Sequence, residues 1–414
     1  MIGINYFKEN KDKILESLKR RGMDPKLGDS LSELLQKRGE LLLRVEEKRR
    51  EINEKTPKSA PDENTKQLLR DLSEETKKID EDLKTAEVEL GSLLGKLPNL
   101  VSPESPEGGE EDFKEIKKWG EIPNIQNPKD HEEIGKNLDL IDFESGTKVS
   151  GAKFYYLKNE AVMLEFALVS YVMKLLVAEG FVPMITPQIV KNEVLEGIGF
   201  APKGPEKQVY GIEGEEMSLI GTAEVTLGGY HKDEVIDEKR LPIKYAGFST
   251  CFRTEAGAYG KHSKGLYRVH QFDKVEMFII CMPGESERMH LYLVDLEEKI
   301  FQGLGLPYRV IEIAAGDLGA PAYRKFDVEV WMPGRGDYGE VTSTSNTTNH
   351  QAIRLNIKFT KDQDREYVHT LNGTAVAISR AMIAILENYQ QADGSVKVPE
   401  ALIPYTGFTE IKSK

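Results

Sequence analysis

The chain has 414 residues, a net charge of −13 and 39% hydrophobic residues, so it holds enough apolar material for a large core, and its length suggests two domains. We expect no membrane-spanning segment, because no apolar run approaches the length of a span, and no secretory signal, because the N-terminus lacks an apolar stretch. Two cysteines, Cys251 and Cys281, indicate a reducing compartment, by default the cytoplasm, and are too few to form a zinc site by themselves.

The first part of the chain predicts two long helices that fold back on each other. From Leu69 to Leu97, apolar residues recur at three- and four-residue spacing, as at the a and d positions of a coiled coil. A looser seam of the same kind runs from Leu31 to Ile52, and residues 56–64 (TPKSAPDEN) have the composition of a tight connection. We therefore expect an antiparallel arm whose second helix, of about thirty residues, is about 45 Å long.

The arm differs in charge from the rest of the chain. Residues 1–100 contain 21 basic and 21 acidic side chains, so the net charge of −13 lies in the remainder. Such an arm could be a dimerisation device, a spacer or a reader of nucleic acid. Basic residues toward its tip favour contact with a phosphate backbone, and the candidates are Arg38, Arg44, Lys48, Arg49 and Lys55.

A change in composition marks the domain boundary. Residues 98–112 (PNLVSPESPEGGEED) are rich in proline, glycine and acidic residues and lack helical periodicity. We expect a helical domain at residues 1–110 and a second domain at residues 111–414. In the second, residues 175–190 (LLVAEGFVPMITPQIV) predict a helix end, a glycine turn and a strand that closes at Pro187.

The most informative segment is residues 252–278 (FRTEAGAYGKHSKGLYRVHQFDKVEMF), where polar residues occur at strand spacing. Residues 244–254 and 267–281 are rich in β-branched and aromatic side chains, and a basic, glycine-bearing loop at residues 256–265 joins them. This pattern predicts a long antiparallel hairpin.

The polar residues of this hairpin suggest a nucleotide site. Because side chains alternate along a strand, we expect Arg268, Phe272 and Glu276 on one face, and Arg253 and Glu255 together on the first strand. Guanidinium groups clamp phosphate oxygens, a ring can stack on a base, and a carboxylate can accept from an exocyclic amine. The alternative is a solvated face with cross-strand ion pairs.

Further on, the pattern predicts a helix at residues 285–304 and strands near residues 308–313 and 326–332. The next predicted strand, YGEVTSTSN, begins at Tyr338. We expect its side chains to alternate, with one face consisting of Glu340, Thr342 and Thr344 and the other of Ser343 and Ser345. A carboxylate flanked by hydroxyl groups suits a hard cation such as magnesium.

The last segment of interest is residues 371–402. Asn372 and Gly373 predict a turn out of the strand EYVHT, and Thr374 can cap a helix that runs to about Gln390. Alanines at positions 377, 381 and 384 give that helix a small apolar face, which Arg380 interrupts. A lone arginine there is either a structural ion-pair partner or a second phosphate clamp.

Together, FRTEAG, GLYRVHQFDKVEMF, GTAEV (residues 221–225), GEVTSTSN and NGTAVAISRAMIAILENYQQADGSVKVPEAL resemble the signatures of the seryl-tRNA synthetases, which are class II aminoacyl-tRNA synthetases. The resemblance runs from Met1 to about Gly407. It implies an α+β fold, in which an N-terminal antiparallel coiled-coil arm precedes a class II synthetase-like antiparallel β-sheet domain flanked by helices. Residues 175–190 resemble the first motif of the class, which implies a homodimer.

The resemblance implies a serine–tRNA ligase that makes seryl-adenylate and pyrophosphate from serine and ATP, then loads the 3′ end of tRNA(Ser), with tRNA(Sec) as a further acceptor to consider. It implies Mg²⁺ with ATP, held by Glu340 and Ser343, and no zinc. Arg253, Glu340 and Arg380 would be catalytic, and no side chain would act as a nucleophile. The implied ATP-binding residues are Arg253, Thr254, Glu255, Arg268, Val269, Phe272, Glu340, Val341, Thr342, Ser343 and Arg380.

For the amino acid, the resemblance implies a pocket in which Glu276 pairs with the serine hydroxyl. Such a site rejects alanine strongly, because the buried carboxylate is left unpaired, and rejects threonine only by sterics. The arm would recognise the long extra stem of the tRNA by its shape. The implied serine-binding residues are Thr222, Ala223, Glu224, Arg253, Glu276, Asn372 and Thr374.

The chain departs from the family pattern mainly at Ile353, where we expect an arginine beside Arg354. Two rival functions remain open. One is a ligase that makes seryl-adenylate but loads another acceptor, such as a carrier protein, and such an enzyme would have no need of the arm. The other is a non-catalytic RNA-binding protein, which would not need to keep an intact set of charged site residues.

Overall fold

The structure, a computed structural model, describes residues 4–201, 208–255, 264–362 and 364–413. The chain divides into two compact units, Met1–Leu100 and Val101–Lys414. This division falls inside residues 98–112, where the composition indicates a linker. Most of the loop predicted at residues 256–265 lies outside the described residues.

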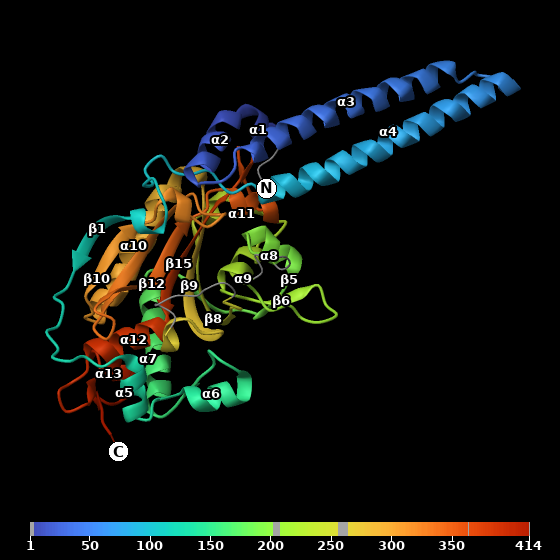
Figure 1. Cartoon of the computed structure of the whole chain (residues 1–414). Coiled ribbons are helices and arrows are strands. Elements are labelled where there is room, and N and C mark those ends of the chain that lie inside the picture. Colours follow the sequence, from blue (N-terminus) through green and yellow to red (C-terminus); the bar gives the residue numbers. More distant parts are fainter. Residues whose placement is uncertain (1–3, 202–207, 256–263, 363, 414) are drawn as a thin grey trace. The chain divides into compact units, whose positions relative to one another are not determined.

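The first unit is the helical arm with a short helical base (Figure 1). Asp62 caps the second arm helix by accepting a hydrogen bond from the Thr65 backbone N–H at 2.7 Å. The predicted seam is buried from Leu72 to Leu90, although Leu94, rather than Leu93, continues it at the base. The antiparallel arm is thus confirmed, and its helices are α1 (Ile4–Glu9), α2 (Lys11–Arg20), α3 (Lys26–Lys55) and α4 (Glu63–Lys96).

The second unit is built on an eight-stranded sheet with the order β1-β10-β11-β12-β15-β9-β8-β4 among the described residues. Its neighbours pair antiparallel, except for β4 and β8, which are parallel. The predicted antiparallel sheet is therefore confirmed. Its strands are β1 (Lys114–Trp119), β4 (Val182–Ile185), β8 (Ile243–Phe252), β9 (Gln271–Cys281), β10 (Tyr308–Glu312), β11 (Arg324–Met332), β12 (Asp337–Asn346) and β15 (His369–Ala377).

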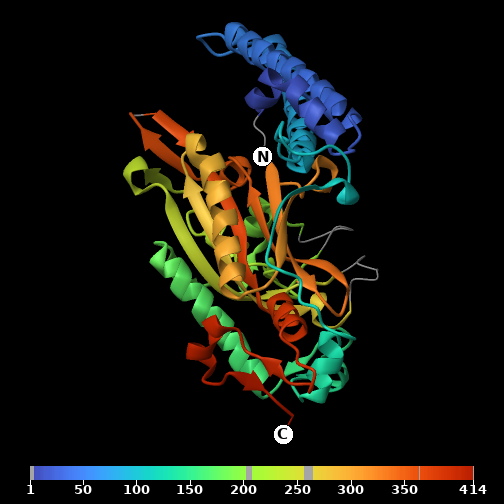
Figure 2. The same cartoon turned by 90° about the vertical axis from the view of Figure 1, so that its left-hand side faces the viewer.

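Helices cover both faces of this sheet (Figures 1 and 2). Side chains of β9 alternate between the two faces of the sheet. Val275, Met277 and Ile279 pack into one apolar cluster, whereas Phe278 and Ile280 pack into another on the opposite face. The first cluster includes α7 (Glu160–Ala178), α10 (Ser286–Gly303) and α12 (Ile378–Asn388), and the second includes α8 (Asn192–Ile198), α9 (Glu224–Gly229) and α11 (His350–Leu355).

Smaller elements complete the second unit. Three more helices are α5 (His131–Asn137), α6 (Phe143–Ser150) and α13 (Ile403–Thr406) in the described part of the chain. Short strands outside the main sheet are β2 (Ile141–Asp142), β3 (Tyr156–Leu157), β5 (Ile189–Lys191), β6 (Met217–Leu219), β7 (Val235–Asp237), β13 (Lys358–Lys361), β14 (Asp364–Tyr367), β16 (Val396–Lys397) and β17 (Glu410–Ile411).

Helix α7 corrects one expectation. By length and composition it could cross a membrane, so the statement that no run approaches a span is wrong. Its residues Ala161, Leu164, Leu168, Val172 and Leu176 are buried in the core of the second unit, as in the core helix of a globular domain. We therefore interpret α7 as a core helix with one exposed apolar side.

The turn predicted at Asn372–Gly373 and the helix start predicted at Thr374 are wrong. Strand β15 runs through all three residues, and α12 begins only at Ile378. Asn372 pairs with Phe278 and Thr374 with Glu276 in the ladder between β15 and β9. This long-range pairing overrides the local turn signal, because strand propensity depends strongly on tertiary context.

The expected alternation along β12 is also wrong at one point. Thr342 lies opposite Val328, whereas Glu340 lies opposite the next residue, Glu329, so β12 carries one extra residue as a bulge. The bulge shifts the alternation by one. Glu340 therefore shares a face with Ser343 rather than with Thr342.

Candidate functional site

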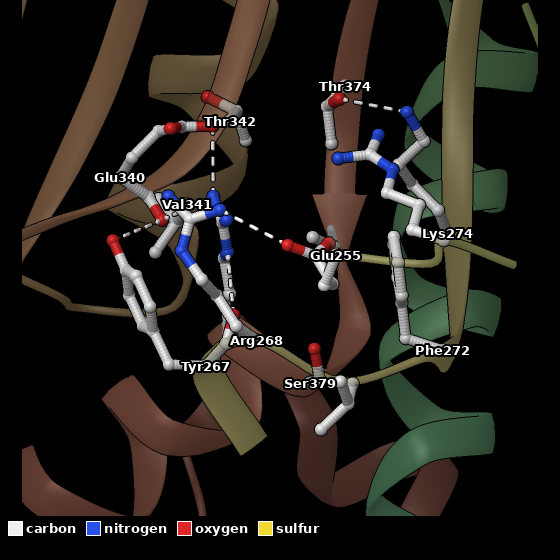
Figure 3. Close-up of a pocket in the computed structure, with 14 residues that line it drawn as sticks. Glu255, Tyr267, Arg268, Phe272, Lys274, Glu340, Val341, Thr342, Thr374 and Ser379 are labelled. Carbon is white, nitrogen blue, oxygen red and sulfur yellow. Dashed lines mark hydrogen bonds and ion pairs between the residues drawn. The ribbon is translucent and has the colours of Figure 1, made fainter. Parts of the chain in front are cut away.

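A cavity lies among the ends of β8 and β9, strand β12 and the start of α12 (Figure 3). It brings together Arg253, Glu340 and Arg380, the three residues expected to be catalytic, although they come from three separate segments. Of the expected ATP-binding set, only Thr254 and Ser343 do not line it. The lining residues are Arg253, Glu255, Tyr267, Arg268, Val269, Phe272, Lys274, Glu340, Val341, Thr342, Thr374, Ala377, Ser379 and Arg380.

Two arginines of the cavity, Arg253 and Arg380, are held by backbone and ring contacts. Arg253 follows the end of β8, its Nε donates to the Gly221 carbonyl at 3.2 Å, and its guanidinium lies 5.3 Å from the centre of the Phe272 ring. Arg380 lies in the first turn of α12, and its guanidinium lies 4.7 Å from the centre of the Tyr267 ring. Aromatic faces attract such cations.

Three cations of the cavity, Arg268, Lys274 and Arg380, form ion pairs with carboxylates. Arg380 approaches Glu340 Oε1 at 2.9 Å, and Arg268 approaches Glu255 at 3.3 Å, as Figure 3 shows for the second pair. Burial opposes ionisation of Glu340, but the charges of Arg380 and Lys325 prevail and lower its pKa to about 2.

These pairs leave little room. The free space in the cavity is about 50 Å³, well below the roughly 300 Å³ at which ligand pockets usually begin. A nucleotide can therefore enter only if these side chains move. Phosphate groups can replace these carboxylates, because a guanidinium group binds carboxylates and phosphates with the same fork of N–H donors.

A buried polar network lies beside the cavity. Asn372 Nδ2 donates to Glu276 Oε1 and to Glu224 Oε2, both at 3.2 Å, and Thr374 Oγ1 donates to Glu276 Oε2 at 3.4 Å. Glu276 is completely buried. Burial first, and then the charge of Glu276, raise the pKa of Glu224 to about 7.

The backbone before α9 positions Glu224. Thr222 and Ala223 precede the helix, and Thr222 Oγ1 accepts a hydrogen bond from the Glu224 N–H at 3.2 Å. On the other side, Gln351 Nε2 donates to Glu224 Oε1 at 2.7 Å. Glu224 and Asn372 also line a second cavity of about 450 Å³, whereas Arg253 and Thr374 line the first.

The donor set near Glu340 suits magnesium. Asp327 lies opposite Ser343 across β11 and β12, and its buried Oδ1 has no hydrogen-bond partner in the described part of the chain. Its Oδ2 lies 3.2 Å from the Lys325 ammonium, and burial raises the pKa of Asp327 to about 7. No group of three or more His, Cys, Asp or Glu side chains among the described residues could hold a metal alone. A magnesium ion here would thus need phosphate oxygens as further ligands.

Among the polar residues of the site that the sequence analysis missed are Lys274, Asp327 and Gln351. Lys274 could have been found, because it lies between Phe272 and Glu276 at two-residue spacing and therefore on the same face of β9. The other two carry no local signal, because only the pairing of β11 with β12 and the packing of α11 bring them to the site.

Three of the five cations expected to bind tRNA form ion pairs between the two arm helices. Arg38 pairs with Glu87 at 3.0 Å, and Lys48 pairs with Glu75 at 2.9 Å, both across the two arm helices. Arg49 likewise reaches Asp80 at 2.9 Å, and Lys55 pairs with Glu51 at 2.6 Å. No such pair is found for Arg44 in the described ranges, and the contact of this set with tRNA stays a prediction.

Both cysteines lie in strands as predicted. Cys251 in β8 and Cys281 in β9 are buried free thiols, and burial raises the pKa of each. Ile353 lies in α11, beside Arg354, whose Nη1 lies 2.8 Å from His350 Nδ1. Nothing in the structure explains why isoleucine stands at position 353.

Comparison with known proteins matches both units. Residues 1–101 match the seryl-tRNA synthetase N-terminal domain, and residues 209–389 match the tRNA synthetase class II core domain (G, H, P, S and T). The chain is 53% identical to the serine–tRNA ligase of Dictyoglomus turgidum, over 100% of both chains. The chain belongs to the seryl-tRNA synthetase family.

Solved structures of the seryl-tRNA synthetase family have the same fold. The enzyme from Pyrococcus horikoshii, complexed with ATP, is 38% identical with a TM-score of 0.93 over 100% of both chains. The cytoplasmic enzyme from Naegleria fowleri, in complex with AMP, is 33% identical with a TM-score of 0.89, over 100% of this chain and 99% of that one. The resemblance and the fold class inferred from the sequence are confirmed.

Proposed function

We propose that this chain is a serine–tRNA ligase that activates serine with ATP and then esterifies tRNA(Ser). One observation carries the proposal: Arg253, Glu340 and Arg380 surround a single cavity next to a buried network centred on Glu276. A carrier-loading ligase would leave the arm without a purpose. A non-catalytic RNA-binding protein would leave the clustered charges without one.

In the first step, a carboxylate oxygen of serine attacks the α-phosphorus of ATP, and the bond to pyrophosphate breaks. Arg253 neutralises the α-phosphate, while Arg268 and Arg380 hold the outer phosphates after leaving Glu255 and Glu340. The adenine stacks on Phe272. The protein contributes positioning and charge neutralisation rather than a nucleophile.

Magnesium accompanies the ATP in this proposal. Glu340 and Ser343 would hold it, and the orphaned Oδ1 of Asp327 lies on the same face of the sheet. When bound, the ion neutralises charge on the phosphate oxygens as a Lewis acid.

The buried network would select the amino acid. Glu276 accepts a hydrogen bond from the serine hydroxyl, and Glu224, in its ionised form, pairs with the α-ammonium group. Thr222, Ala223, Asn372 and Thr374 complete the pocket. In the second step, a hydroxyl group of the terminal ribose attacks the carbonyl carbon of seryl-adenylate, and AMP leaves.

The homodimer and the division of labour between the units are part of the same proposal. Residues 1–110 would bind tRNA, and residues 111–414 would hold both catalytic steps and the dimer interface, in the cytoplasm. Phe166 of α7 is 61% exposed and Ile185 of β4 is 84% exposed. Large apolar side chains exposed on adjacent elements often mark a protein interface.

A charging assay with total tRNA tests the proposal. We expect serine to be charged efficiently, threonine weakly and alanine hardly at all. Serine-dependent pyrophosphate exchange, measured without tRNA, should occur as well. Exchange without any charging would point to a carrier-loading ligase, and the absence of both would leave a non-catalytic protein.

A further inference from the structure

Lys274 is a buried lysine that the proposed reaction does not yet use. It exposes 5% of its surface and lies on the same face of β9 as Phe272 and Glu276. It also lines the cavity that contains Arg253. A buried ammonium group is costly unless it is paired and hydrogen-bonded, so its contacts indicate what it is there for.

Those contacts are with two residues of the amino-acid pocket. The Lys274 ammonium forms an ion pair with Glu276 Oε2. It also donates to Thr374 Oγ1 at 3.4 Å, as Figure 3 shows. Because an ammonium group can only donate, Thr374 Oγ1 must accept from it, and the Thr374 hydroxyl hydrogen is then directed to Glu276. Lys274 thus orients both groups at once.

The acceptor positions of Glu276 can be counted. A carboxylate offers about four acceptor positions. The donors that reach Glu276 in the described part of the chain are Asn372 at Oε1, and Thr374 and Lys274 at Oε2. This arrangement leaves about one acceptor position for a ligand, which matches one hydroxyl hydrogen.

We propose that Lys274 is a positioning residue for amino-acid selection: it holds the Glu276 carboxylate and the Thr374 hydroxyl so that one acceptor position faces the serine hydroxyl. The inference rests on the proposed function and deepens it. Without Lys274, Glu276 loses its buried counter-charge, and the Thr374 hydroxyl is free to rotate toward other acceptors. Serine then loses its advantage over alanine, whereas ATP binding, which relies on the arginines, changes little.

The test uses the full-length chain and serine-dependent and alanine-dependent pyrophosphate exchange. For Lys274→Met, we expect the KM for serine to rise at least about tenfold and the serine-over-alanine ratio of kcat/KM to fall at least about tenfold. The KM for ATP should change less than about threefold. Lys244→Met is the matched control, because Lys244 lies on the adjacent strand β8 and donates to the Glu179 carbonyl at 2.5 Å, outside the cavity.

A double-mutant cycle separates positioning from mere stability. In a Glu276→Gln background, adding Lys274→Met should change the kcat/KM for serine by less than about threefold, because Lys274 acts through Glu276. This double variant also removes both buried charges, so it should fold even if Lys274→Met alone does not. If the two substitutions instead act independently, so that their fold-losses in kcat/KM multiply in the double variant, the inference is overturned.

The two proposals fail in different ways. If the unmodified protein shows no serine-dependent exchange, the proposed function falls, and the role of Lys274 falls with it. If the unmodified protein prefers serine and Lys274→Met keeps that preference, only the role of Lys274 is rejected.

Discussion

Glu276 is a fully buried side chain whose partners are all hydrogen-bond donors. In the proposed amino-acid pocket, Glu276→Ala removes the acceptor for the serine hydroxyl, and it leaves Lys274 without its counter-charge. We expect serine-dependent pyrophosphate exchange to fall at least about a hundredfold, because losing a partner of a buried charge costs several kcal/mol. An unchanged exchange rate would remove this carboxylate from the amino-acid pocket.

Glu224 should make serine binding depend on pH. Burial raises its pKa to about 7, so it is neutral below that pH and anionic above it. Only the anion attracts the α-ammonium group, so serine affinity should rise with pH through 7. Between about pH 6 and about pH 8 we expect the KM for serine to fall about tenfold, as one ionisation dictates.

The control for this pH dependence is Glu224→Gln, which cannot ionise. Its KM for serine should be high and nearly flat over the same range. A profile in the Gln variant that still changes about tenfold would assign the ionisation to another group.

At the scale of elements, the pairing of β15 with its neighbours determines where Asn372 and Thr374 lie in the site. A Cβ added at Gly373 would lie 3.1 Å from Thr344 Oγ1, 3.2 Å from Glu297 Oε1 and 3.3 Å from Met277 Cε. We expect Gly373→Ala to lower the free energy of unfolding by about 1–3 kcal/mol through overpacking. It should also raise the KM for serine, because the adjacent Asn372 and Thr374 shift with the strand.

The matched glycine lies in the arm. A Cβ at Gly91, within α4, meets nothing within 4 Å. Gly91→Ala should therefore stabilise the arm by about 0.5–1 kcal/mol through helix propensity, without affecting serine activation. Chemical denaturation followed by far-UV circular dichroism measures both variants, and changes of the same sign in the two would contradict this account.

At the scale of the whole molecule, the two compact units suggest separable roles. Deletion of residues 30–97 removes most of α3 and all of α4 and leaves the polar network of the second unit intact. We expect charging of tRNA to be lost and serine-dependent pyrophosphate exchange to remain within a few-fold of the full chain. Loss of both activities in a folded variant would argue against the division of labour.

The proposed dimer is tested at its most exposed apolar residue. Ile185→Glu places a charge on the outer strand β4, where the side chain is 84% exposed. We expect sedimentation equilibrium to report a dimer for the unmodified chain and a shift toward monomer for this variant, because a buried unpaired charge disfavours an interface. Val88→Glu is the control, since Val88 is also highly exposed, at 73%, but lies on the arm.

Local patterns predicted much of this molecule. The seam from Leu72 to Leu90 indicated the arm because a helix repeats its faces every three or four residues. The β8–β9 hairpin followed from strand composition, and the clustering of Arg253 with Phe272 from family motifs. Strand alternation did not apply to Arg253 or Arg268, because Arg253 follows the end of β8 and Arg268 precedes β9. The sequence failed where residues far apart decide the outcome, as at the bulge beside Glu340 and in the strand through Asn372.

By itself, the sequence determined the family, the helical arm and most of the residues that line the cavity, because periodicity and contiguous motifs are properties of neighbouring residues. Only the tertiary structure decided that Glu340 faces the same way as Ser343, and that Lys274, Asp327 and Gln351 belong to the site. These facts depend on strand register and helix packing. Register is set by partners distant in the chain, and a shift of one residue turns every following side chain to the other face.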